Sequence, residues 1–113
     1  MGAEQQTATG ASSVPPGGWV RVTSGFYEGL EVGLDRDWLV IGRGRGADLV
    51  LAEPTISRAH AAVGWDGEHF FVQDLGSTNG TRLNGEALKK EKGPLASGDE
   101  VRIGRLVLRM TLP

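Results

Sequence analysis

The sequence predicts an all-β domain, an antiparallel β-sandwich or barrel built from short strands. Glycine and proline interrupt the chain so often that the longest run without either is residues 55–63, nine residues long. This spacing leaves little room for helices of average length. The stretches between the interruptions are rich in β-branched and aromatic residues, a pattern typical of antiparallel sandwiches and barrels.

Nine segments are candidate strands. They are residues 20–23, 30–34, 38–41, 49–51, 60–65, 69–74, 81–84, 100–103 and 106–112. Asp66-Gly67 predicts a hairpin turn between two of them, since this pair readily adopts the backbone angles of tight β-turns. The charged stretch 86–92 could form either a one-turn helix or a loop.

The first 18 residues differ in composition from the rest. They consist mainly of Gln, Thr, Ala, Ser, Gly and Pro, with Glu4 as the single charged residue. Such a segment buries too little apolar surface to offset the entropy of ordering. We therefore expect residues 1–18 to be a disordered leader or linker, followed by one domain over residues 19–113.

Composition and charge exclude several classes of function. The chain has no cysteine and two histidines, so neither a disulfide framework nor a metal site is expected. Its formal charge of -2 does not favour nucleic acid or an anionic membrane. No secretory signal or membrane-spanning stretch is visible, and we expect a cytoplasmic protein without a cofactor.

Three polar clusters stand at the ends of predicted strands. They are GRGRG at 42–46, TISRAH at 55–60 and GSTNGT at 76–81. Loops gather at the two ends of a sandwich, so the clusters can converge. Arg43, Ser57 and Thr78 would supply guanidinium and hydroxyl donors suited to an oxyanion. Taken singly, each cluster is also explained by solvated arginines and turn-capping hydroxyls.

Together the motifs resemble a known family. Gly42-Arg43, the SRAH of residues 57–60 and the STNGTRLNG of residues 77–85 are similar, in this order, to the forkhead-associated (FHA) domain, a phosphothreonine-binding module. The resemblance covers roughly residues 19–112. It implies an antiparallel sandwich of about eleven strands, of the FHA/SMAD type, with loops at one end forming the binding site.

The resemblance also implies roles for individual residues. Arg43 would hold the phosphate, with Ser57 adding its hydroxyl and Arg58 its amide or side chain. Thr78 would give another contact near the phosphate, and Asn79 would bond the main chain of the bound peptide.

A second set of residues would shape the site or read the residues that follow the phosphothreonine. Gly42, His60 and Gly80 would support the loops. Thr55 and Ile56 would form the specificity loop, to which Arg82 and Arg105 could add an acidic preference.

The function implied is a phosphothreonine-dependent adaptor that recruits a partner phosphorylated by a Ser/Thr kinase, the partner being the kinase or its substrate. The alternative is a phosphate-independent FHA-like scaffold, or one inhibited by its own tail through phosphorylated Thr7 or Thr9. A Ser57, His60 and Asp74 triad is disfavoured, because residues three apart leading into a strand point to opposite faces. We therefore expect no enzymatic activity. The oligomeric state is left open.

Overall fold

The computed structural model describes residues 13–88 and 92–113, which form eleven strands and no helix. The strands are β2 (Trp19–Val22), β3 (Glu31–Gly33), β4 (Trp38–Gly42), β5 (Leu49–Val50), β6 (Ala61–Trp65), β7 (Phe70–Asp74), β8 (Thr81–Leu83), β9 (Glu86–Ala87), β10 (Gly93–Pro94), β11 (Glu100–Ile103) and β12 (Leu106–Thr111). None of the described residues forms a helix long and apolar enough to cross a membrane.

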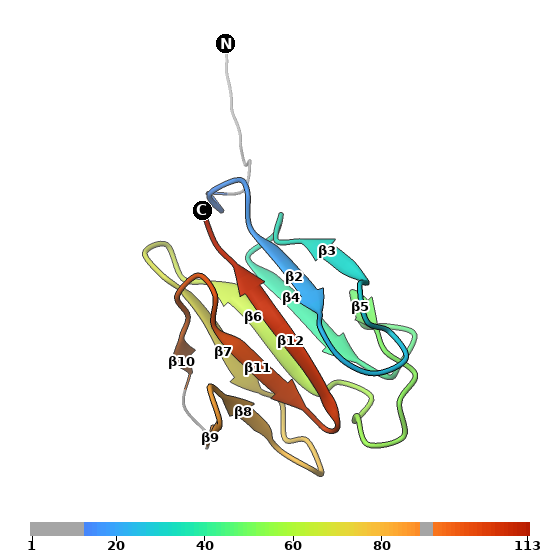
Figure 1. Ribbon diagram of the computed structural model, residues 1–113. Coiled ribbons are helices and arrows are strands. Elements are labelled where there is room, and N and C mark those ends of the chain that lie inside the picture. Colours follow the sequence, from blue (N-terminus) through green and yellow to red (C-terminus); the bar gives the residue numbers. More distant parts are fainter. Residues whose placement is uncertain (1–12, 89–91) are drawn as a thin grey trace.

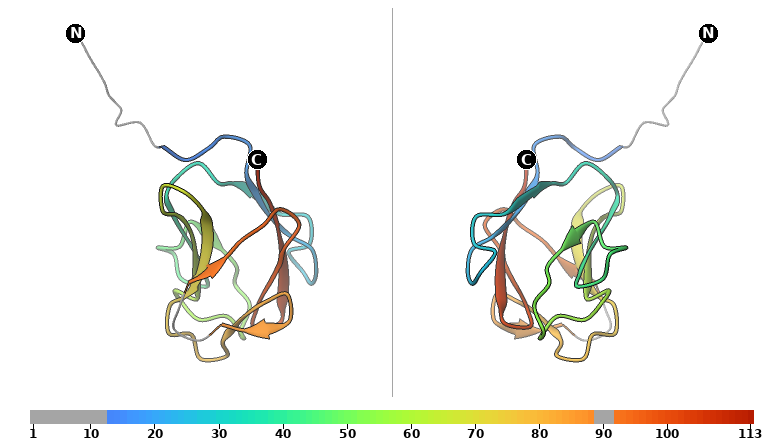
Figure 2. Two further views of the ribbon diagram at one scale, coloured as in Figure 1. Left: turned by 90° about the vertical axis from the view of Figure 1, so that its left-hand side faces the viewer. Right: turned by 90° about the vertical axis from the view of Figure 1, so that its right-hand side faces the viewer.

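The strands form two sheets that face each other as a sandwich (Figures 1 and 2). One sheet has the order β10-β7-β6-β4-β5 and the other the order β3-β2-β12-β11-β8-β9. Every pair of neighbours is antiparallel except β4 and β5, which are parallel. The predicted sandwich is therefore confirmed, and the barrel alternative is wrong.

Alternating side chains fill the space between the sheets. In β11, Val101 and Ile103 are fully buried while the alternating residues Glu100 and Arg102 are exposed, as a strand with one solvated face requires. Leu39 and Ile41 of β4 supply the opposite side of the same core. Burial of this apolar surface from both sheets is the main stabilising contribution to the fold.

All nine predicted strands are present, with ends that differ by at most one residue. The Asp66-Gly67 hairpin is confirmed as well, since the Asp66 carboxylate accepts the backbone N–H groups of Glu68 and His69. Two strands were missed, β9 and β10, because each has two residues and consists of types that are uncommon in strands, Glu-Ala in β9 and Gly-Pro in β10. The helix suggested within 86–92 is wrong at its start, where Glu86–Ala87 pair with β8; residues 89–91 lie outside the described part.

The three polar clusters lie at the opposite end of the sandwich from the two ends of the described chain (Figure 1). They follow β4, precede β6 and follow β7, strands that neighbour one another in the first sheet. Of the predicted leader, residues 1–12 lie outside the described residues. Val14 packs against the core.

Candidate functional site

The first two clusters are joined main chain to main chain. The N–H of Arg43 donates to the carbonyl of Ser57 at 2.9 Å, and that of Gly44 donates to the carbonyl of Arg58 at 3.1 Å. Gly42 makes this approach possible, since a Cβ there would run into the carbonyl of Arg58. The end of β4 and the 57–58 segment therefore form one unit.

Arg43 is exposed but its guanidinium is anchored. Its Nε donates to the carbonyl of Ile56 at 2.8 Å. Within the described residues its two terminal nitrogens have no partner, so they remain available as charged donors. Arg58 is also exposed, and neither its amide nor its guanidinium has a partner among the residues described.

The buried imidazole of His60 connects the second cluster to the third. His60 is 0% exposed, and its Nδ1 accepts the N–H of Ser57 at 3.0 Å. Nε2 must then carry the ring proton, and it donates to the carbonyl of Gly80 at 2.8 Å. Both ring nitrogens are satisfied, and each one fixes a different loop.

A carboxylate organises the third cluster from inside. Asp74, the last residue of β7, accepts the hydroxyls of Ser77 and Thr81 on Oδ1, each at 2.6 Å. Its Oδ2 accepts the backbone N–H groups of Gly76 and Ser77. Burial by itself would raise the pKa of Asp74, but these hydrogen bonds outweigh it and lower the pKa below the ordinary value.

Side-chain bonds complete the junction between the second and third clusters. The Oγ of Ser57 accepts the N–H of Thr78 at 3.0 Å, which leaves the Ser57 hydroxyl proton free to donate. Asn79 Nδ2 donates to the carbonyl of Thr55 at 2.9 Å. Within the described residues, the Thr78 hydroxyl and Asn79 Oδ1 have no partner, and both side chains are exposed.

Thr55 ties the site to the β11–β12 hairpin. Its hydroxyl donates to Glu53 Oε1 at 2.7 Å and accepts the N–H of Arg105 at 2.9 Å. Gly104 has φ +56°, and a Cβ there would lie 2.5 Å from the Thr55 carbonyl oxygen. Hydrogen bonds from the amide and hydroxyl of Thr55 lower the pKa of Glu53.

The structure brings together most of the residues singled out by sequence. The N–H groups, carbonyls and side chains of Arg43, Ser57, Thr78 and Asn79 form one connected network, while Gly42, His60 and Gly80 support it from behind. Thr55 and Arg105 are neighbours beside this network.

Two of the specificity residues lie elsewhere. The side chain of Ile56 is 1% exposed and belongs to the core, so only its main chain reaches the site. Arg82, on β8, donates from its guanidinium to the carbonyl of Gly85 in the β8–β9 turn. Sequence reasoning considered Asp74 only as a triad member and overlooked Glu53. The signal for Asp74 was a carboxylate at a strand end just before a Ser/Thr-rich turn.

The same geometry is incompatible with a Ser57, His60 and Asp74 hydrolase triad. His60 accepts the main-chain N–H of Ser57, while the Ser57 hydroxyl accepts the N–H of Thr78. Asp74 bonds Ser77 and Thr81 instead of the imidazole. The site has the features of a binding site. Its loops present guanidinium and hydroxyl groups at one end of a sandwich, and this arrangement is that of a domain that binds an anionic group.

The chain belongs to the forkhead-associated family. The family model described as FHA domain matches residues 39–104, which confirms the resemblance seen in the motifs. The solved structures that resemble this chain include the FHA domain of FhaA in complex with the intracellular domain of Rv3910, with a TM-score of 0.74 and 31% identity over 83% of this chain and 99% of that one. A structure from a study of phosphothreonine-dependent FHA domain interactions has a TM-score of 0.76 and 30% identity, over 85% of this chain and 96% of that one.

Two relatives by sequence are named as regulators. The chain is 39% identical over 109 residues to the oxoglutarate dehydrogenase inhibitor of Corynebacterium diphtheriae, covering 95% of this chain and 75% of that protein. It is 35% identical over 105 residues to the glycogen accumulation regulator GarA of Mycobacterium tuberculosis, covering 92% of this chain and 64% of GarA. The chain therefore spans about three quarters of the first relative and just under two thirds of the second.

Replacing Gly42 with alanine should destabilise the fold. The added Cβ forces apart the main chains of β4 and the 57–58 segment, and overpacking of this kind costs about 1–3 kcal/mol. Urea unfolding measures the loss. Gly46→Ala is the matched control, because a Cβ at Gly46 meets nothing within 4 Å. Equal stability of the two variants would contradict the close approach.

Replacing His60 with alanine should lower the free energy of unfolding by about 2–4 kcal/mol, since it leaves a cavity and removes the partners of the part-buried Ser57 N–H and Gly80 carbonyl. Thermal unfolding followed by circular dichroism measures this. The control is His69→Ala, which removes an exposed imidazole and should change stability by no more than about 0.5 kcal/mol. A melting temperature unchanged in His60→Ala would refute its supporting role.

Replacing Asp74 with asparagine should cost about 1–2 kcal/mol at neutral pH, because the amide cannot accept four hydrogen bonds. The folded-state pKa of Asp74 is lowered, so its stabilising contribution is present above the unfolded-state pKa and is lost as the pH falls through the folded-state value. The stability gap between the wild type and Asp74→Asn should therefore narrow below about pH 4.

Urea unfolding at neutral and acidic pH measures this gap. Asp37→Asn, at an exposed carboxylate without a side-chain partner in the described part of the chain, is the control and should show little difference from the wild type at either pH. A gap for Asp74→Asn that stays constant with pH would show that the carboxylate charge is not what holds the loop.

Proposed function

We propose that this chain is a phosphothreonine-dependent interaction module that recruits a partner phosphorylated by a Ser/Thr kinase. One observation carries the proposal. The three loops are joined into one hydrogen-bonded network, and this network still has hydrogen-bond donors without partners among the described residues. Arg43 keeps its terminal guanidinium nitrogens, and Ser57 keeps its hydroxyl proton. A phosphate monoester is an acceptor with the charge and the number of oxygens to use these donors together.

Each residue has a distinct role in the proposed complex. Arg43 contributes charge-assisted hydrogen bonds, each typically worth about 1.5–3 kcal/mol. Ser57 and Thr78 donate hydroxyls, and Arg58 donates its unpartnered amide or its guanidinium. The free Oδ1 of Asn79 accepts an N–H from the peptide main chain, while Nδ2 stays bonded to Thr55.

Threonine is favoured over serine in this proposal because its extra methyl group can be buried, worth about 0.8 kcal/mol. Residues that follow the phosphothreonine would meet Thr55 and Arg105, which the structure places side by side. Ile56 is left out of this reading since its side chain is in the core.

The relatives named as an inhibitor and a regulator support a regulatory, non-enzymatic role, which in this proposal is exercised in the cytoplasm. The complex of the FhaA domain with another protein's intracellular domain is a parallel for recruitment of a protein partner. In this proposal the partner is a Ser/Thr kinase or one of its substrates, and the interaction is reversible, since a short peptide must be ordered on binding.

Calorimetric titration with phosphothreonine, phosphoserine and unphosphorylated versions of one degenerate peptide library tests the function. Binding should be confined to phosphothreonine and should disappear in Arg43→Ala, because an unphosphorylated ligand leaves the donors without their acceptor. Arg102→Ala, at an exposed arginine of β11 in the other sheet, is the control and should bind normally.

Circular dichroism establishes that each variant is folded. Normal binding by folded Arg43→Ala would refute the site, and a folded wild type that binds none of the libraries would favour a phosphate-independent scaffold instead.

A further inference from the structure

A groove of about 710 Å³ lies beside the proposed phosphate site. It runs between the 43–47 loop and the 58–59 segment. Its apolar lining comes from Val40, Ala47 and Ala59, and its charged lining from Arg43, Arg45 and Arg58. Arg43 is the proposed phosphate ligand, whereas the proposed function leaves Arg45 without a role.

The groove gathers positive charge without any compensating carboxylate. No Asp or Glu among the described residues lines it, although the chain as a whole carries a formal charge of -2. Some arginines elsewhere form ion pairs: Arg21 lies 3.1 Å from Glu31, and Arg109 lies 2.8 Å from Glu100. In the part of the chain that the structure describes, Arg45 and Arg58 have no such partner.

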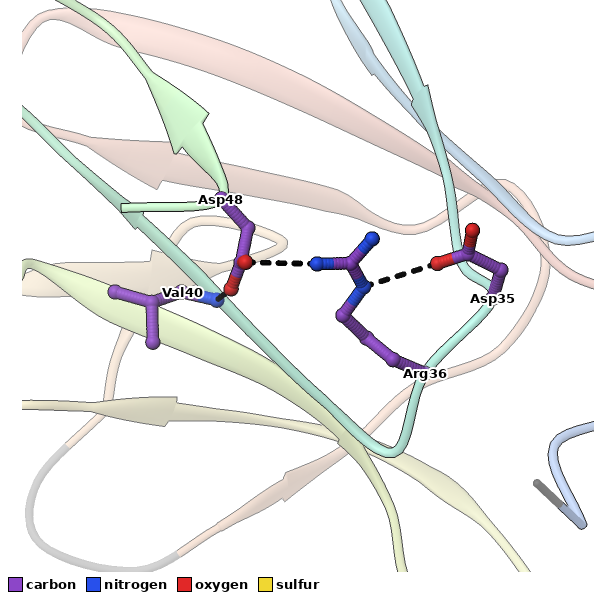
Figure 3. A network of polar contacts seen from close by, with 4 residues as sticks. All are labelled: Asp35, Arg36, Val40 and Asp48. Carbon is purple, nitrogen blue, oxygen red and sulfur yellow. Dashed lines mark hydrogen bonds and ion pairs between the residues drawn. The ribbon is translucent and has the colours of Figure 1, made fainter. Parts of the chain in front are cut away.

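The acid nearest to Arg45 in the sequence is already engaged. Asp48, three residues later, accepts Arg36 Nη1 on Oδ1 at 2.8 Å and the N–H of Val40 on Oδ2 at 2.8 Å. Figure 3 shows this network, in which Asp35 holds the other side of the Arg36 guanidinium. Both oxygens of Asp48 therefore already accept hydrogen bonds, from Arg36 and Val40, so neither is left to pair with an arginine of the groove.

An apolar lining with guanidinium groups suits a side chain that has a short aliphatic stem and an anionic end. We propose that the groove binds a second anionic group of the same ligand, carried by a residue close to the phosphothreonine, and that Arg45 is its principal partner. This inference rests on the proposed function and adds to it a preference for ligands with clustered negative charge. The anion is either a carboxylate or a second phosphate.

Isothermal titration of the full chain with one phosphothreonine peptide series tests the inference. The plain peptide has alanine on both sides of the phosphothreonine; in the other members a glutamate, or alternatively a phosphoserine, replaces one alanine at each neighbouring position in turn. At one or more positions the anion should tighten binding by about fivefold or more relative to the plain peptide.

The readout is the ratio of dissociation constants between the plain and the anion-bearing peptide. In Arg45→Gln this ratio should fall to within about twofold of one, and it should fall in the wild type as salt screens the contact. In the control Arg102→Gln, which removes an equal charge from the other sheet, the wild-type ratio should persist.

The glutamate and phosphoserine peptides distinguish the possible outcomes. A gain with glutamate identifies a carboxylate site, and a gain with phosphoserine alone identifies a second phosphate site. Binding of the plain peptide with no gain at any position, or a gain that survives in Arg45→Gln, overturns the inference while the proposed function stands. Failure of every peptide to bind overturns both.

Discussion

The buried imidazole of His60 is the interaction on which the binding end depends. Its two nitrogens hold the main chains of Ser57 and Gly80, so the separation of two loops is set by the width of one ring. The ring is wholly buried, and the close packing of the core restricts its changes of rotamer. Loops are usually the mobile part of a sandwich, and here a single residue of the core removes that freedom.

Other hydrogen bonds restrain the parts of these loops that lie farther from the core. Asp74 consumes the inner donors of its loop, and Thr55 joins the site to the β11–β12 hairpin. Most polar groups in these loops are thus satisfied by the protein itself, and those left over are the ones that a ligand can use. Such preorganisation lowers the ordering cost of binding, so that modest contacts suffice for a specific complex.

Sequence predicted the parts of this structure that repeat and missed those that depend on distant partners. Alternation of apolar residues and turn chemistry located nine strands, but β9 and β10 exist only because neighbouring strands offer them hydrogen bonds. The three clusters were found because guanidinium and hydroxyl groups beside glycine are conspicuous. Ile56 was placed in the specificity loop because the family resemblance puts that loop just before Ser57, whereas the burial of its side chain depends on packing against distant residues. The strand-end role of Asp74 depends on a turn that the linear sequence does not display.

Both ends of the described chain emerge at the pole of the sandwich opposite the three loops (Figure 1). The six residues of β12 alone put about 20 Å between the two poles. A fluorophore, affinity handle or surface linker joined at Pro113 would therefore sit remote from any docked peptide. The domain is therefore suited to attachment to a surface through this end. The three loops would then point away from the surface, and every attached molecule would have the same orientation.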